Sequence, residues 1–271
     1  MSKSCARSVQ DYSNAVDALR SNAQELKVLD AEFAAAIMCL FLAEMVQSVQ
    51  SRKSAFIASK DWIDIPFSAS PPSLMQQLIN VSLVLPSLLE RVDHLTEMSS
   101  ALQNSEVSDL WHSCLHLFSR LESWEESLHG QWMWSQPLGS DSRPSLLGAD
   151  IWFTDITKAN FYMHLWAFQI ICILELNHLA DVHTACRSWI LPKGSANIQE
   201  ASRKIYRSMK YLLQDEMRLF GPASAMLPLQ TAYKVFSADK CKYTCELEYL
   251  RRIVDCLVEK GLRSTPDMVY T

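Results

Sequence analysis

Glycine is scarce in this chain, with only 6 among 271 residues. Tight turns between strands depend on glycine, because it adopts positive φ angles without a steric penalty. Sandwiches, barrels and propellers need many such turns and are therefore disfavoured. The Gly-rich phosphate-binding patterns GxGxxG and GxxxxGKS/T do not occur in the sequence. Hydrophobic residues make up 49% of the chain, which is enough to fill a core.

Apolar residues recur at the helical spacing of three and four along almost the whole chain. The predicted helices cover about residues 9–26, 31–50, 73–98, 106–129, 155–187, 196–219, 223–237 and 240–260. No segment alternates clearly with the period of two that is typical of a strand. The sequence therefore predicts an all-α fold, an irregular bundle of about eight helices.

The predicted helix at about 155–187 is the expected centre of this bundle. Its stretch Phe161–Leu176 is apolar on nearly all sides, which is typical of a helix buried in a core. A membrane span needs about 20 predominantly apolar residues, and His164 and Gln169 interrupt this stretch. We therefore expect a core helix and no membrane contact.

Several residues predict where the helices begin, bend and end. Asp30 and Ser195 have side chains suited to capping a helix N-terminus. Pro86 predicts a kink, because it removes one backbone donor from a helix. The pair Gly221–Pro222 and Gly261 are typical stop signals. We expect a single domain over residues 1–271, with a possible subdivision at the Pro-, Gly- and Ser-rich segment 135–150.

The charge and cysteine content narrow the function classes. The net charge is −5, whereas surfaces that bind nucleic acid are usually basic, so direct nucleic-acid binding is not expected. The pairs Arg203–Lys204 and Arg251–Arg252 are expected on solvated helix faces.

The sequence contains no CxxC pair, which disfavours a zinc finger or zinc cluster. The N-terminus lacks an apolar signal segment, so we expect a reducing, intracellular environment.

Three groups of residues have spacings that metal sites also use, and for each we favour a structural interpretation. They are His112 with His116, Cys241 with Cys245 and Cys256, and Asp61 with Asp64. The histidines lack the glutamate of a metalloprotease helix, and the three thiols lack a fourth ligand. The aspartates form a DxxD, which invites comparison with the magnesium–diphosphate motif of terpene cyclases, but the second motif of that family is missing. We predict no catalytic residue, metal site or cofactor.

One candidate ligand pocket can be named from the sequence. Trp152, His164 and Trp166 could combine a polar tip with aromatic walls, an arrangement that can orient a small ligand. Aromatic residues at helical spacing are nevertheless more often part of a core.

Four stretches, taken in order, resemble the C-terminal helical region of fungal-specific zinc-cluster (Zn2Cys6) transcription factors. They are DALRSNAQELKVLDAEFAAAIMCLFLAEMV, SAFIASKDWIDIPF, WFTDITKANFYMHLWAF and MLPLQTAYKVF. Trp62 and Pro66 fall at the family's W-x-x-x-P position, and Pro86 lies in its proline-bearing helix. The resemblance covers about residues 12–261.

Two departures from that family shape the expected function. The chain has neither the six paired cysteines nor the basic charge of the zinc-cluster module that reads DNA. The family's helix pair with a Trp-x-x-His-x-x-Gly pattern is missing, because only about 16 residues separate Val46 from Trp62. The resemblance implies a nuclear regulator without its own DNA-binding module. It would act through contacts with other proteins, and the expected partner is a DNA-binding regulator of the same family. Its expected role is to regulate a secondary-metabolite gene cluster.

Two alternatives stay open at this point. The chain could be an accessory or enzymatic protein of a fungal biosynthetic cluster that uses the same scaffold around a small-molecule pocket. It could also be a decayed gene product that folds poorly because the 46–62 region is short. Turnover of a pathway intermediate would favour the first, and a non-cooperative thermal melt would favour the second. The sequence predicts no oligomeric state.

Overall fold

The fold is taken from a computed structural model that describes residues 31–59, 63, 71–97, 103–128, 130–136, 148–182, 198–218 and 220–270. The predicted helix at about 9–26 and the residues Asp30, Asp61, Trp62, Asp64, Pro66 and Ser195 lie outside these ranges. The chain divides into two compact units, residues 1–87 and 88–271. The predicted subdivision at 135–150 falls by residue number within the second unit.

The first unit is built on α2 (Ala31–Ser51), which matches the predicted helix closely. It packs against α4 (Leu74–Ser82). Between them lies the short 3-10 helix η1 (Phe56–Ala58). The buried carboxylate of Glu44 accepts a hydrogen bond from the backbone N–H of Phe56 at 3.3 Å. This bond holds the start of η1 to α2.

The helix predicted over 73–98 is wrong as a single element, because it is broken into two helices. α4 ends at Ser82 and α5 (Val84–Glu97) begins two residues later. Pro86 has no N–H to donate to the carbonyl four residues back, which is that of Ser82. Without this bond the first helix ends at Ser82. Pro86 therefore interrupts the helix as predicted, but the interruption lies four residues before the proline and not at it.

The second unit is organised around α7 (Ile156–Val182), which confirms the predicted central helix. Asp155 caps its N-terminus, because its carboxylate accepts a hydrogen bond from the backbone N–H of Lys158 at 2.9 Å. Every residue in 159–173 is buried. The predicted C-terminal residues 183–187 lie outside the described ranges.

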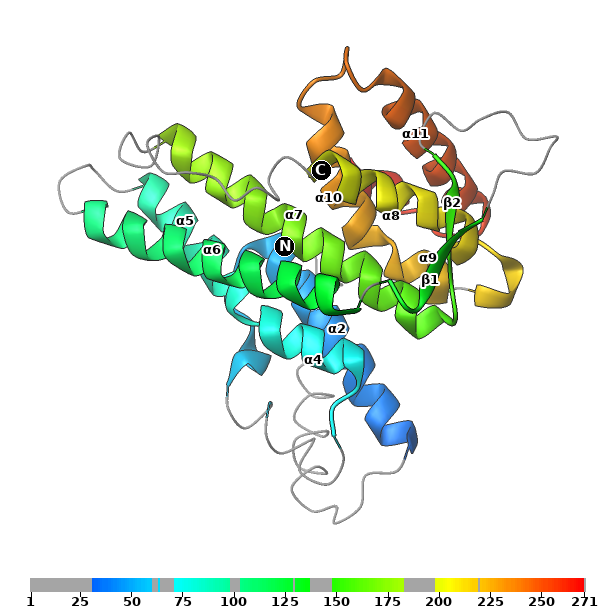
Figure 1. The fold of residues 1–271 in the computed structure, drawn as a ribbon, viewed down its shortest axis with the longest axis horizontal. Helices are drawn as coiled ribbons and strands as arrows, with labels where there is room; N and C mark the ends of the chain where they lie inside the picture. The colour runs from blue at the N-terminus through cyan, green and yellow to red at the C-terminus, as the bar shows by residue number, and fades with distance from the viewer. Residues whose placement is uncertain are drawn as a thin grey trace, which may run out of the picture. The chain divides into compact units, whose positions relative to one another are not determined.

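The neighbours of α7 enclose it within the second unit. They are α6 (Gln103–Leu128), α8 (Ile198–Leu212) and α10 (Met226–Ser237). Figure 1 shows α6 running alongside α7, with α8 and α10 gathered beside one half of it. The stretch Ile156–Asp181 is long and apolar enough to cross a membrane, but 94% of its most apolar window is buried inside the fold, as in a core helix.

A short β-hairpin precedes α7 and was not expected from the sequence. β1 (Met133–Gln136) pairs antiparallel with β2 (Asp150–Phe153), and Trp134 lies opposite Trp152. β2 packs against α8. Each strand has only four residues, so the alternation of buried and exposed positions is too brief to stand out from the helical pattern.

The predicted stop signal at Gly221–Pro222 is wrong, since α8 already ends at Leu212. Both residues lie inside the short helix α9 (Phe220–Ser224), which follows the 3-10 helix η4 (Asp215–Met217). A Cβ at Gly221 would clash with the carbonyl oxygen of Leu212. Glycine is therefore needed here for close packing and not for ending a helix.

The stop signal at Gly261 is confirmed. This residue follows α11 (Thr244–Glu259) with a φ of +100°, a conformation that favours glycine. Its N–H donates to Val258, and the N–H of Leu262 donates to Leu257, each at 3.0 Å, as in a Schellman motif. The short α12 (Thr265–Val269) follows and packs on α10.

Candidate functional site

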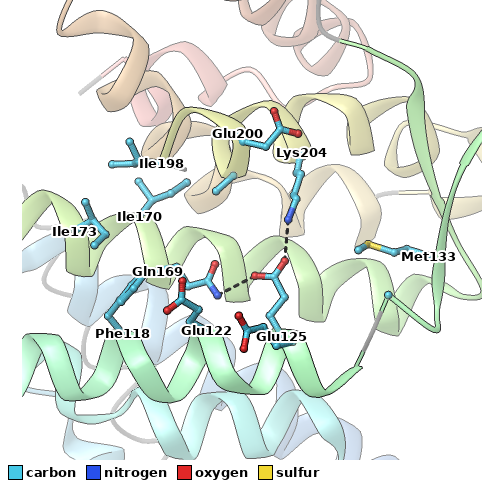
Figure 2. Close-up of a pocket in the computed structure, with 13 residues that line it drawn as sticks. Phe118, Glu122, Glu125, Met133, Gln169, Ile170, Ile173, Ile198, Glu200 and Lys204 are labelled. Carbon is cyan, nitrogen blue, oxygen red and sulfur yellow. Dashed lines mark hydrogen bonds and ion pairs between the residues drawn. The ribbon is translucent and has the colours of Figure 1, made fainter. Parts of the chain in front are cut away.

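A partly open pocket of about 750 Å³ lies within the second unit, between α6, α7 and α8 (Figure 2). On α6, residues Phe118, Glu122 and Glu125 contribute to its wall. They are spaced by four and three residues, which places them on one face of the helix. Gln169 of α7 and Lys204 of α8 face them. The spacing of these three residues in the sequence therefore explains why they form one wall of the pocket together.

One end of the pocket is apolar. Figure 2 shows Phe118 of α6, Ile170 and Ile173 of α7 and Ile198 of α8 grouped together at this end. Hydrocarbon groups of a ligand would lose contact with water here, which contributes roughly 25 cal/mol per Å² of apolar surface buried. This end can therefore hold the apolar part of a small molecule.

The other end of the pocket is crossed by a polar network centred on Glu125. Its Oε1 accepts hydrogen bonds from the Lys204 ammonium at 2.9 Å and from the Trp166 indole N–H at 2.8 Å. Its Oε2 accepts one from the Gln169 amide at 2.9 Å. The Lys204 ammonium also lies 5.4 Å from the centre of the Trp166 ring. One carboxylate thus joins three helices.

The surroundings give two neighbouring glutamates opposite pKa shifts. Burial raises the pKa of Glu125, but the Lys204 charge and the hydrogen bonds from Trp166, Lys204 and Gln169 outweigh it, so the pKa lies below its ordinary value. The pKa of Glu122 is raised, first by partial burial and then by the negative charges of Glu126 and Glu125. The surroundings therefore favour the charged form of Glu125, whereas partial burial and the neighbouring negative charges disfavour the charged form of Glu122.

The three residues of the sequence-predicted pocket do not line this one. Trp166 lies just behind it, fully buried, and contacts two of its lining residues, Glu125 through a hydrogen bond and Lys204 through its ring. His164 is also buried in α7, and its Nδ1 donates to the backbone carbonyl of Asn160 at 2.9 Å. Trp152 is in β2, with its ring centre 5.7 Å from that of Tyr211.

The candidate metal ligands from the sequence do not converge where they are described. His112 and His116 are exposed on α6, and Nδ1 of His112 donates to the carbonyl of Ser108 at 2.7 Å. Cys241 and Cys245 are exposed, and Cys256 is half-buried. Within the described ranges, no three His, Cys, Asp or Glu side chains form a group that could hold a metal ion.

The basic side chains of α8 are engaged with neighbouring elements, which corrects the expectation that Arg203–Lys204 lies on a solvated face. Arg203 forms an ion pair with Glu246 of α11 at 2.9 Å, and its side chain is 31% exposed. Lys204 pairs with Glu125 as described above. Lys210 pairs with Asp150 of β2 at 3.0 Å. These ion pairs join α8 to α11, α6 and β2.

Sequence reasoning missed the residues that form the pocket. Glu122, Glu125 and Glu126 occur close together on a predicted helix, which is usually a sign of a solvated face. In the sequence, Gln169 stands out only as an interruption of an apolar stretch. A buried polar residue needs a hydrogen-bond partner, so a glutamine inside an apolar stretch indicates a polar partner on a neighbouring element. This was the one sequence signal that pointed to the site.

Comparison with protein-family models, with curated proteins and with solved structures finds no match to this chain.

Proposed function

We propose that this chain is a regulatory module that binds a small organic molecule in the pocket between α6, α7 and α8. The observation that carries the proposal is the lining of that pocket, which combines an apolar end with a fixed set of polar groups. Ligand sites in proteins typically have volumes of about 300–1,000 Å³ and this kind of lining. Most of its lining residues lie on three packed helices.

The proposal also keeps the mode of action that the sequence resemblance implies. The module would work in the nucleus through contact with a protein partner, a DNA-binding regulator of the zinc-cluster family, and would not bind DNA itself. The net charge of −5 supports this, because surfaces that contact phosphates are usually basic. Regulation of a secondary-metabolite gene cluster is part of the same proposal.

Filling the pocket should weaken ligand binding. Ala201 contributes to the pocket wall on α8, and Ala201→Leu would place a larger side chain in the space. We expect saturation-transfer NMR with a panel of aromatic and aliphatic fragments, carrying positive, negative or no charge, to find binders of the unmodified chain. We expect Ala201→Leu to weaken those binders about tenfold or more.

Ala238→Leu is the matched control, since Ala238 is exposed at the end of α10, outside the pocket lining. It should leave fragment binding unchanged. A thermal melt of each variant verifies folding. If no fragment of any charge binds, or if Ala201→Leu and Ala238→Leu bind equally well, the pocket has no ligand function.

The purified chain should not bind duplex DNA, even at low salt where attraction to phosphates is greatest. Fluorescence anisotropy with a labelled duplex measures this, with a zinc-cluster DNA-binding domain as positive control. The net charge of −5 is the physical reason. Salt-sensitive binding in the micromolar range or tighter would contradict this part of the proposal.

A further inference from the structure

The charges around the pocket are strongly unbalanced. Among the lining residues that the structure describes, four are glutamates, Glu122, Glu125, Glu126 and Glu200, and the only cation is Lys204. A cleft with low-dielectric walls concentrates the electric field of the charges that line it. The charged side chains that line the described part of the pocket are therefore mainly negative.

Two of these carboxylates already have a cation. Glu125 is paired with Lys204 at 2.9 Å, and Glu200 lies 3.3 Å from the guanidinium of Arg207. In the described part of the chain, no salt bridge links Glu122 or Glu126 to a basic side chain. Among the residues that the structure describes, these two negative charges at the pocket therefore have no basic partner.

The apolar end selects what kind of cation can satisfy them. Phe118 and Glu122 are one helical turn apart on α6, so the apolar wall begins directly beside a carboxylate. A hydrated metal ion has no group to place against Phe118, Ile173 and Ile198. An organic ammonium on a hydrocarbon body has both the charge and the apolar surface that this arrangement fits.

We infer that the pocket takes an organic cation, a primary ammonium group carried on an aromatic or aliphatic body. This inference rests on the proposed ligand function and specifies its chemistry. The ammonium lies between Glu122 and Glu126, and the body lies against Phe118, Ile173 and Ile198. The raised pKa of Glu122 is consistent with this: partial burial, and then the charges of Glu126 and Glu125, disfavour its charged form, and a bound cation would offset these effects.

Three probes with the same body and different charge test the inference. Phenylbutylamine, phenylbutanol and phenylbutyrate are titrated into the unmodified 271-residue chain in a calorimeter. We expect the amine to bind at least about tenfold more tightly than the alcohol, and the carboxylate to bind most weakly. Added salt should weaken the binding of the amine and leave the binding of the alcohol unchanged.

The double variant Glu122→Gln/Glu126→Gln removes the two uncompensated charges while keeping the side-chain shapes. It should bring the affinity for phenylbutylamine down to that for phenylbutanol. The matched control is Glu248→Gln/Glu259→Gln, which makes the same change in net charge at two exposed positions of α11. The control should keep the preference for the amine.

The outcomes separate this inference from the proposal on which it rests. Equal affinity for the amine and the alcohol, or tighter binding of the carboxylate, overturns the cation preference while leaving a ligand pocket in place. An amine preference that survives Glu122→Gln/Glu126→Gln overturns the assigned position of the ammonium. If none of the three probes binds and the fragment panel also gives nothing, both ideas fail.

Discussion

Replacing Trp166 with alanine should lower the free energy of unfolding by about 4 kcal/mol, near the middle of the range for buried aromatic residues. The side chain is fully buried in α7, with its ring centre 5.5 Å from that of Tyr162. Its removal would leave a cavity beside the pocket and take one of the donors from Glu125. Unfolding in urea, followed by circular dichroism, measures the change.

Trp166→Phe separates packing from hydrogen bonding. Phenylalanine keeps most of the apolar volume but cannot donate to Glu125, so the expected cost is about 2 kcal/mol, as for hydrogen bonds to charged groups. The pKa of Glu125 should rise in this variant, because the indole hydrogen bond helps to lower it. NMR titration of the carboxyl group measures that shift. If Trp166→Ala cost less than about 1 kcal/mol, the side chain would not be the buried core residue described here.

Acidification should destabilise the chain by about 3 kcal/mol between pH 6.5 and pH 4 through a single histidine. Burial lowers the pKa of His164 from 6.5 to about 4, although its hydrogen bond to Asn160 acts in the opposite direction. In this range the unfolded chain binds a proton at this site and the folded chain does not. Stability is therefore complete above pH 6.5 and is lost as the pH falls toward the folded pKa.

The variant His164→Gln cannot titrate, so its unfolding free energy should change less over this range, with the difference from the unmodified chain as the measured quantity. Carboxylates also titrate near the lower limit, and taking the difference removes their contribution. His112→Gln, at an exposed position of α6, controls for the loss of a histidine elsewhere. Identical pH dependence in His164→Gln and the unmodified chain would show that His164 is not held neutral in the core.

Long helices with clear apolar faces were the predictable part of the fold. α2 and α7 begin within one residue of their predicted starts, because each is rich in apolar residues over many helical turns. The break at Ser82 was missed, since the apolar stripe continues through it without interruption. The hairpin and α12 were missed because four or five residues carry too little pattern to be distinguished from their surroundings.

The candidate site was harder to predict than the fold. Glu125 of α6 and Lys204 of α8 are 79 positions apart, and no local pattern connects them. Each looks like a surface residue when its own helix is considered alone. What makes them a site is how three helices are arranged, and apolar periodicity indicates which face of a helix is buried but not which helix it meets.

The shared carboxylate of Glu125 makes its partners interdependent. Trp166, Gln169 and Lys204 all donate to the same two oxygen atoms, so the loss of one changes what the other two contribute. Substitutions at these positions will not have additive effects. Over generations, a tolerated exchange at one of them depends on which residues occupy the others, so the four positions are constrained as a group.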